Sequence, residues 1–591
     1  MNYDLNQKNN QENKVSKSSI YGSWKSMWLF LKSSQRDLIW AGVAIILNSV
    51  LNLMAPVLIG QAVDRFISQK LFDGVLVYSA ILLVLFILAF LANYLQTIKM
   101  GTVGQKALYE LRNAIFTKLQ DLPIAFFNQN KAGDLISRIN NDSDKLNQFF
   151  SQTLMQFVGN IFIMIGAAIL LLVINPLMGL VALIPTLFLL IFTRLVSPWV
   201  KNRNALSLQN TGGMSAEIQE SLDNFKVIAA YNRRDYFQKQ FDLVNKQNYQ
   251  SAILAGMANN IFIPTYGLLA HLGQFGVLML GLYLIGNGQF TIGWLVSYLA
   301  YVNIFYTPLR QMASLWAGFQ VALAGWDRIV NILELKNNLL IEKNIGVKSV
   351  STENLITFKN VSFAYPDGKE VLSNINFNLE AGKTYAFVGP TGGGKTTTAS
   401  LMARLYDPTN GTIYFGGRDI RSYKPEERTQ KIGYILQEPF LFTGSLRENI
   451  VYGNNLCQDT TPEKLMEILR QAGLKKLLDR FNDGLETQIK PGDDSVSHGQ
   501  KQLIAFIQVV LRQPDLLILD EATANIDTMT EQLLQEILDK LPKKTIRVII
   551  AHRLNTIAKA DVIFFVNNGR IVEAGSMEQA VDMLIHEQRK S

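Results

Sequence analysis

The sequence has few cysteines and few charged residues. Cys457 is the single cysteine among 591 residues, so no disulfide can form within the chain, and a disulfide-stapled secreted fold is excluded. Charged residues make up 18% of the chain, whereas soluble proteins typically contain about 25%. The hydrophobic fraction is 48%, too high for an intrinsically disordered chain. This composition therefore argues against both disorder and a purely soluble protein.

The distribution of charge predicts a membrane protein. The net charge of +8 is compatible with binding either nucleic acid or an anionic membrane surface. Four segments have no charged residue at all: 38–63, 74–98, 146–193 and 247–309. A membrane-spanning helix needs about 20 apolar residues. Turn signals at Asn175-Pro176 and at Gly286-Asn287-Gly288 divide the two longer segments. We therefore expect six spans, a membrane lipid environment and no nucleic-acid partner.

Lysine and arginine in the connections predict the orientation of these spans. Residues 99–145 contain seven of these basic residues and residues 194–246 contain eight, whereas the first connection has only Arg65 and Lys70. Because basic connections stay on the cytoplasmic side, we expect a multi-pass protein of the cell membrane with both termini in the cytoplasm. Both basic segments are too long for turns. We expect helices that extend into the cytoplasm and reverse near 126–133 and 231–236, where aromatic residues could serve as docking knobs.

A phosphate-binding motif follows in the second half of the chain, where short β-rich runs alternate with helical stretches. The strand 384–388 leads into a loop of the pattern GxxxxGK[ST], followed by a helix. Its glycines allow backbone N–H groups to converge on phosphate oxygens, and the helix N-terminus adds partial positive charge. Lys395 would reach the β- and γ-phosphates, and Thr396 would bind Mg²⁺. The expected nucleotide-binding residues here are Gly389, Pro390, Thr391, Gly392, Gly393, Gly394, Lys395, Thr396 and Thr397.

A second apolar strand, residues 516–520, ends in two carboxylates. Asp520 is placed to hold Mg²⁺ or its waters, and Glu521 is placed to polarise the attacking water as general base. Together with the phosphate loop, the pair predicts a site that hydrolyses a nucleoside triphosphate.

The order of further motifs resembles the ATP-binding-cassette (ABC) family. The resemblance rests on the signature-like segment Val496-Ser497-His498-Gly499-Gln500, on Gln437 in Ile-Leu-Gln-Glu-Pro, on the turn 524–527, on His552 in Ile-Ile-Ala-His-Arg and on Tyr365 in Phe-Ala-Tyr-Pro. Six spans ahead of one cassette are similar to a half-size ABC exporter, and residues 126–142 are similar to that family's first coupling-helix region. The resemblance covers residues 21–585.

This resemblance implies the fold, the cofactors and the roles of the motif residues. The fold would be a six-span α-helical membrane bundle fused to an α/β P-loop cassette: a disordered tail at 1–20, a transmembrane domain at 21–330, a linker at 331–354 and a cassette at 355–591. ATP and Mg²⁺ would bind between two cassettes. Tyr365 would stack on adenine, Gln437 would link Mg²⁺ to the membrane half, and His552 would contact the γ-phosphate. Ser497, Gly499 and Gln500 would bind the nucleotide of a second subunit.

The signature segment departs from the family pattern Leu-Ser-Gly-Gly-Gln. Leucine is replaced by Val496 and the first glycine by His498, and residues 490–493 read Lys-Pro-Gly-Asp where many exporters have a Gly-Glu-Arg-Gly-like loop. One interpretation is that the family tolerates other residues at these positions of the signature. The other is a heterodimer in which this chain supplies the hydrolytic residues and lends a weakened signature to a second site. The expected partner is a second half-transporter subunit, with a heterodimer favoured over a homodimer.

Three functions stay open. The first is ATP-driven export of small hydrophobic or amphipathic compounds, of the multidrug type; the second is a lipid or glycolipid flippase; the third is an ATP-gated channel or sensor. An intact Glu521 and His552 argue against the third. His271, in the fifth apolar run, has two open interpretations: a proton relay or substrate contact, and an interhelical hydrogen bond. Cys457 has no assigned role, and the sequence does not identify the substrate.

Overall fold

A computed structural model describes most of the chain. The described residues are 3–5, 26–28, 30–337, 339, 354–366, 368–454, 457, 459–481, 483–490, 496–520, 528–539, 541–550, 557, 559–575, 578–579 and 582. The chain divides into two compact units. One contains residues 11–119 and 133–334, and we call it the membrane unit. The other contains residues 1–10, 120–132 and 335–591, and we call it the cassette unit.

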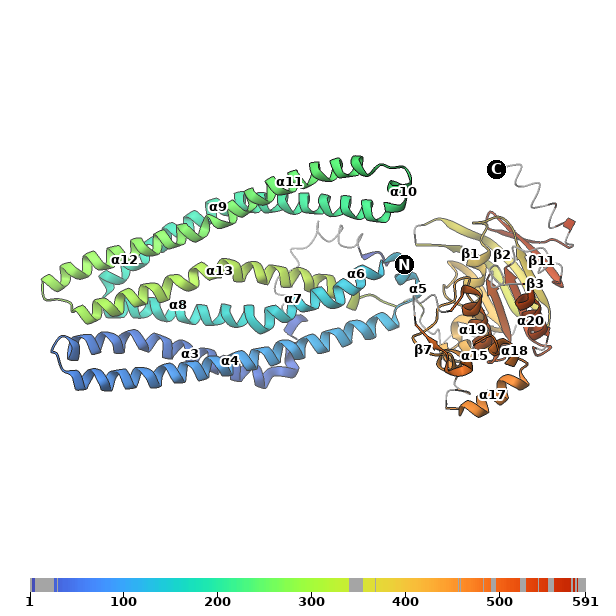
Figure 1. Ribbon diagram of the computed structural model, residues 1–591, viewed down its shortest axis with the longest axis horizontal. Helices are drawn as coiled ribbons and strands as arrows, with labels where there is room; N and C mark the ends of the chain where they lie inside the picture. The colour runs from blue at the N-terminus through green and yellow to red at the C-terminus, as the bar shows by residue number, and fades with distance from the viewer. Residues whose placement is uncertain are drawn as a thin grey trace. The chain divides into compact units, whose positions relative to one another are not determined.

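Long helices form the membrane unit (Figure 1). They are α3 (Gln35–Ala62), α4 (Phe72–Asp121), α8 (Leu154–Ile174), α9 (Pro176–Asp223), α11 (Arg234–Asn260), α12 (Phe262–Gly286) and α13 (Ile292–Leu333). Shorter helical segments complete it: η1 (Lys32–Ser34), η2 (Val63–Ile67), α6 (Ala132–Ser137), η3 (Arg138–Asp142), α7 (Ser143–Gln148), η4 (Phe149–Thr153) and α10 (Phe225–Ala230). Helix α13 packs against α3, α8 and α12, and α9 packs against α11 and α12.

Among the described residues, six helices are long and apolar enough to cross a membrane, which confirms the predicted number. They span Lys32–Ile67, Phe72–Asp121, Ala132–Ile174, Pro176–Asp223, Arg234–Gly286 and Ile292–Leu333. Large apolar side chains point outward along them; Leu83 is 62% exposed and Val173 is 73% exposed. Apolar surface of this extent is stable against lipid rather than against water.

Local capping explains the tight turns between the spans. Asn175 has an extended backbone and its side chain accepts a hydrogen bond from the N–H of Met178, while Pro176 occupies the first turn of α9. Thr291 caps α13 in the same way through the N–H of Trp294. The Asp64 carboxylate, from the end of the first span, accepts a further bond from the N–H of Gly293 at 2.7 Å. The predicted reversals at Asn175 and after Gly286 are therefore confirmed.

Polar side chains of the fifth span, His271 among them, form hydrogen bonds within the membrane unit. The Nδ1 atom of His271 lies 3.1 Å from Oε1 of Gln274 on the same helix, α12. The Nε2 atom of Gln274 donates to Oδ1 of Asn303 on α13 at 2.7 Å. Gln274 thus makes the bond between the two spans, and His271 contacts Gln274 along their shared helix.

Two sheets form the framework of the cassette. An antiparallel sheet has the order β2-β1-β4-β5, and a six-stranded, mostly parallel sheet has the order β12-β11-β3-β10-β9-β6. The strands of the first are β1 (Asn354–Ala364), β2 (Glu370–Glu380), β4 (Asn410–Phe415) and β5 (Arg418–Asp419). Those of the second are β3 (Thr384–Val388), β6 (Ile432–Ile435), β9 (Leu516–Asp520), β10 (Ile546–Ile550), β11 (Val562–Asn567) and β12 (Arg570–Glu573). A short pair, β7 (Gly444–Ser445) and β8 (Gln488–Ile489), lies outside both sheets.

The remaining cassette elements are helical. They are α14 (Lys395–Met402), η5 (Ile420–Ser422), α15 (Pro425–Lys431), α16 (Leu446–Val451), α17 (Pro462–Gln471), α18 (Lys475–Leu478), η6 (Gly484–Glu486), α19 (His498–Val510) and α20 (Thr528–Asp539).

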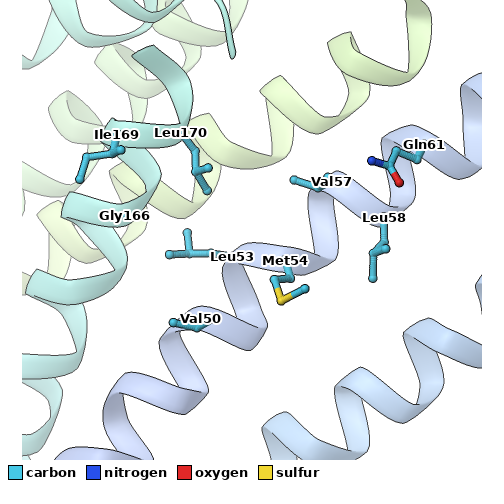
Figure 2. Close-up of a pocket in the computed structure, with 9 residues that line it drawn as sticks. All are labelled: Val50, Leu53, Met54, Val57, Leu58, Gln61, Gly166, Ile169 and Leu170. Carbon is cyan, nitrogen blue, oxygen red and sulfur yellow. The ribbon is translucent and has the colours of Figure 1, made fainter. Parts of the chain in front are cut away.

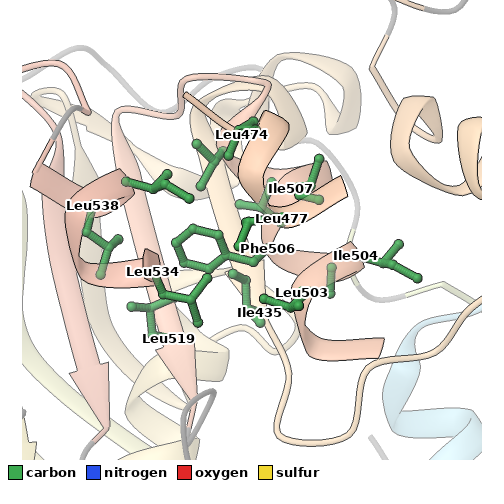
Figure 3. Close-up of a cluster of buried hydrophobic side chains, with 14 of the residues drawn as sticks. Ile435, Leu474, Leu477, Leu503, Ile504, Phe506, Ile507, Leu519, Leu534 and Leu538 are labelled. Carbon is green, nitrogen blue, oxygen red and sulfur yellow. The ribbon is translucent and has the colours of Figure 1, made fainter. Parts of the chain in front are cut away.

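Two apolar clusters hold the cassette together. In the first cluster, Phe377 packs against Phe358, Phe387 and Phe564 and so joins the two sheets. In the second cluster, Phe506 of α19 lies among aliphatic side chains of β6, β9, α18 and α20 (Figure 3). The second cluster thereby fixes α19, and with it the segment that resembles the ABC signature, against the six-stranded sheet.

The two reversals within the basic connections differ in burial. The first is formed by α5 (Ile124–Gln129), which belongs to the cassette unit, and its Phe126 is fully buried. The second lies between α10 and α11 in the membrane unit, and its Tyr231 is 76% exposed. Of the two aromatic knobs, only the first is covered within this chain.

Within segment 1–20, the described residues depart from the predicted disordered tail. Tyr3 and Leu5 are buried in the cassette unit. Two apolar side chains in a polar segment are enough for local docking, although the segment's average composition is typical of disorder.

Candidate nucleotide site

Parallel strands bring the predicted phosphate loop and the predicted metal ligand to one edge of the sheet. The loop follows β3, Asp520 is the last residue of β9, and Gln437 lies two residues beyond β6. Strands β3 and β9 both pair in parallel with β10, and β6 pairs in parallel with β9. Their carboxyl ends therefore face the same side, which is where open α/β sheets bind ligands.

The loop glycines are required by both conformation and space. Gly389, Gly392 and Gly394 have φ values of +146°, +81° and +114°, which side chains rarely tolerate. A Cβ on Gly389 would lie 2.0 Å from the carbonyl oxygen of Val566, and one on Gly393 would lie 2.6 Å from the same oxygen. The glycines thus allow the loop to lie directly on β11.

Lys395 is preorganised within the loop. Its ammonium group donates to the carbonyl oxygens of Gly389 and Pro390 at 2.8 and 2.9 Å, and the residue is buried. Lys395 also begins α14, so a buried positive charge and a helix N-terminus meet in the same loop. This arrangement is suited to an anion with several oxygens.

The candidate metal ligands Thr396 and Asp520 contact each other. The Thr396 hydroxyl donates to Oδ1 of Asp520 at 3.5 Å, and Asp520 is 4% exposed. A hydroxyl and a carboxylate are the hard oxygen donors that Mg²⁺ prefers, so these residues fit the ion. The third candidate, Gln437, is exposed beside the end of the neighbouring strand.

Tyr434 is a site residue that sequence reasoning missed. Its hydroxyl donates to Oδ2 of Asp520 at 3.1 Å from the adjacent strand β6. Burial, together with the Asp520 carboxylate, raises the pKa of Tyr434 well above its usual value, so the hydroxyl keeps its proton and remains a donor. The contact could not be predicted from the sequence, because it depends on the order of the strands in the sheet.

Aromatic residues surround the candidate adenine platform. The ring of Tyr365 lies edge-on to Phe363 and Tyr406, with ring centroids 4.9 and 5.5 Å apart. The hydroxyl of Tyr365 lies 3.0 Å from that of Thr397. The structure therefore joins Tyr365 directly to the helix that follows the phosphate loop, and Thr397 uses its hydroxyl to hold the ring.

Helix α5 reaches this aromatic cluster. The side-chain nitrogen of Asn128 donates to the hydroxyl of Tyr406 at 2.7 Å. The first reversal of the chain thus contacts a residue that packs on the candidate adenine platform.

The signature-like segment caps α19. Ser497 accepts a bond from the N–H of Gln500 at 3.2 Å, and the Gln500 side chain accepts one from the N–H of Ser497 at 2.9 Å. Ser497 is exposed, whereas Val496 is buried in the core cluster beneath it. Gly499 follows within the first turn of α19. Val496 therefore serves as an apolar anchor that holds an exposed serine and a helix N-terminus at the surface.

Two predicted catalytic residues lie outside the described residues. Glu521 follows Asp520 directly, and His552 follows the last residue of β10 by two positions. Their strands end at the same edge as the phosphate loop, and their roles stay predictions.

The fold and the site together define a class: a membrane-spanning protein with a P-loop nucleotide-binding domain. The family model described as "ABC transporter transmembrane region" matches residues 38–309, and the one described as "ABC transporter" matches residues 372–524. The chain belongs to the ABC transporter family.

Relatives that align over most of the chain support this assignment. The chain is 32% identical over 581 residues to an uncharacterized ABC transporter ATP-binding protein, YfiC, of Bacillus subtilis (strain 168), covering 98% of this chain and 95% of the relative. It is 29% identical to the putative multidrug export ATP-binding/permease protein YgaD of the same organism, covering 81% and 82%. It is also 29% identical to an ATP-dependent lipid A-core flippase of Syntrophus aciditrophicus (strain SB), covering 82% and 80%. The chain is thus a half-size ABC exporter, an ATP-hydrolysing multi-pass membrane protein.

Proposed function

We propose that this chain uses ATP hydrolysis to export hydrophobic or amphipathic compounds by alternating access, as one half of a dimer. One observation carries the proposal: a single chain contains both six apolar spans and a nucleotide-binding cassette. In that cassette, Lys395, Thr396 and Asp520 lie at the same edge of the sheet. Residues 21–330 act as the transmembrane domain and residues 355–591 as the cassette, joined by the linker 331–354. Both termini and the cassette lie in the cytoplasm, in agreement with the basic connections.

The residues of the site divide the work of hydrolysis. Lys395 and the loop N–H groups bind the β- and γ-phosphates, and Tyr365 stacks on adenine. Thr396, Asp520 and Gln437 hold Mg²⁺, which supplies charge stabilisation on the phosphate oxygens. Glu521 accepts the proton of the attacking water, and His552 contacts the γ-phosphate.

The exposed surfaces support dimerisation. Tyr231 of the second reversal and Ser497 of the signature segment are exposed in this chain. A second subunit covers both: its cassette binds the reversal at Tyr231, and Ser497, Gly499 and Gln500 contact the nucleotide that it holds. Because Val496 and His498 depart from the family pattern, the partner is a different half-transporter. Its signature segment, with the family pattern, completes the nucleotide site that contains Glu521.

An apolar groove of the membrane unit supports the class of substrate. A groove of about 540 Å³ lies between α3 and α8 (Figure 2), a size that suits a small molecule. Gly166 brings the helices together, since a Cβ there would lie 2.3 Å from Leu53. Apolar side chains line the groove, and Gln61 provides a carboxamide at one end. Such a groove accepts the apolar part of an amphipathic molecule. It also favours the second candidate function, a lipid flippase.

Stimulation of ATPase activity by candidate substrates tests the proposal. The purified chain, together with its partner half-transporter, is assayed with hydrophobic dyes and with lipids at saturating ATP. We expect stimulation by amphipathic compounds, and none in Lys395→Met, which lacks the phosphate-binding ammonium group. Met54→Trp, which fills the groove, should reduce stimulation, whereas Val173→Trp on an outward surface of α8 should not. Stimulation that survives in Lys395→Met would contradict the proposal.

A further inference from the structure

The first described residues of the chain are docked on helix α5. Tyr3 is 2% exposed and Leu5 is fully buried, and both belong to the compact unit that contains α5 and the cassette. Burial of this kind is unusual in a segment of polar composition. The contacts are specific enough to define a binding site.

Two side-chain amides bind the backbone of this segment: Gln129, the last residue of α5, and Asn130, which follows it. Oε1 of Gln129 accepts a bond from the N–H of Tyr3 at 2.8 Å. Oδ1 of Asn130 accepts one from the N–H of Leu5 at 3.2 Å, and Nδ2 of Asn130 donates to the carbonyl oxygen of Tyr3 at 3.0 Å. Asn130 is itself fixed by a bond to the carbonyl oxygen of Phe126 at 2.8 Å. The amides thus satisfy backbone groups that burial would otherwise leave unpaired.

The side chain of Tyr3 joins α5 to the chain that leads into the cassette. Its ring packs edge-on against Phe126, with centroids 6.4 Å apart. Its hydroxyl donates to the carbonyl oxygen of Lys336 at 3.0 Å. The next residue, Asn337, donates to the carbonyl oxygen of Asp121 at 2.6 Å. Tyr3 therefore bridges the first reversal and the segment between α13 and β1.

We propose that α5 and residues 335–337 form a peptide-binding site for an extended segment with a tyrosine and, two residues later, an aliphatic side chain. Tyr3–Leu5 fill this site and act as a latch, a segment that holds α5 against residues 335–337. The latch supports communication between the transported compound and the nucleotide site; this role rests on the proposed function.

The position of α5 explains why the latch affects hydrolysis. Residues of the same short helix make both contacts: Phe126 and Gln129 hold the latch, and Asn128 donates to Tyr406 beside the adenine platform. In the chain, α5 connects α4 with α6, both of which continue into spans. Release of the latch loosens α5. Binding of a substrate in the membrane then has a smaller effect on the nucleotide site than it has when the latch is docked.

Binding of the isolated segment tests the site without any assay of activity. A peptide of residues 1–10, with a fluorophore at its C-terminal end, is titrated with the full-length chain lacking residues 2–10. We expect saturable binding, at least tenfold weaker for a peptide with Tyr3→Ala and Leu5→Ala, and weaker again when the protein carries Gln129→Ala. Equal binding of the two peptides, or none, overturns the site.

Hydrogen exchange of the intact chain provides a second test if the shortened chain fails to fold. The amides of Tyr3 and Leu5 should be protected from exchange, and Gln129→Ala should reduce the protection of Tyr3. Complete exchange of both amides within seconds in the unchanged protein overturns the docking.

The ATPase of the full-length pair tests the role of the latch. Tyr3→Ala with Leu5→Ala should remove at least half of the stimulation by a transported compound and leave the unstimulated rate within twofold, whereas Asn9→Ala should change neither. Unchanged stimulation overturns the coupling role. Peptide binding in a protein that has no ATPase activity would contradict the proposed function and leave the site in place.

Discussion

Replacement of Tyr434 by phenylalanine tests how the metal-binding carboxylate is positioned. The substitution keeps the ring and removes only the hydroxyl that donates to Oδ2 of Asp520. A hydrogen bond to a charged group contributes about 1.5–3 kcal/mol net. Because Asp520 keeps its contact with Thr396, we expect a loss at the lower end of that range. About 1.4 kcal/mol corresponds to a factor of ten in an equilibrium constant.

The assay is ATPase activity as a function of Mg²⁺ concentration at fixed nucleotide. In Tyr434→Phe, the concentration of Mg²⁺ for half-maximal activity should rise about tenfold, because Oδ2 of the Asp520 carboxylate loses the hydroxyl donor that orients it. Tyr414→Phe, on the antiparallel sheet, is the matched control and should leave the midpoint unchanged. A midpoint in Tyr434→Phe that equals or lies below that of the unchanged protein would refute the reasoning.

Three further predictions concern residues identified from the sequence. Glu521→Gln should lower turnover at least about 100-fold while ATP still binds, because glutamine cannot accept the proton of the attacking water; near-normal turnover would show that another group is the base. Tyr365→Ala should weaken ATP binding by about 1–2 kcal/mol through loss of stacking, whereas Tyr365→Phe, which keeps the ring, should bind nearly as well; nucleotide titration distinguishes them. His498→Gly should change the ATPase of the heterodimeric pair only modestly, and the chain alone should be a weak ATPase; a robust, substrate-stimulated ATPase from this chain alone would favour a homodimer instead.

Local patterns were sufficient to predict the spans and the phosphate loop. The reversal at Asn175-Pro176 depends on one side-chain cap and one proline, both readable within four residues. The phosphate loop depends on glycines whose φ values are set by the loop itself, and the absence of charge along each span is a property of a single segment. Features of this kind need no knowledge of tertiary contacts.

Contacts between distant residues could not be predicted in this way. The bond from Tyr434 to Asp520 crosses 86 positions and depends on β6 lying beside β9. Asn128 and Tyr406 are 278 positions apart, and their contact depends on how α5 packs in the cassette unit. Tyr3 and Leu5 stand in a segment whose average composition indicates disorder, and composition cannot reveal that Asn130 satisfies their backbone groups.

Transport into inside-out membrane vesicles tests the central claim most directly. Vesicles that contain the chain and its partner are given a fluorescent amphipathic dye, and uptake is followed with ATP and with a non-hydrolysable analogue. We predict uptake with ATP only, and loss of uptake in Glu521→Gln although that variant still binds ATP. Equal uptake by Glu521→Gln, or uptake driven by the analogue, would contradict the claim that hydrolysis at this chain's site drives export.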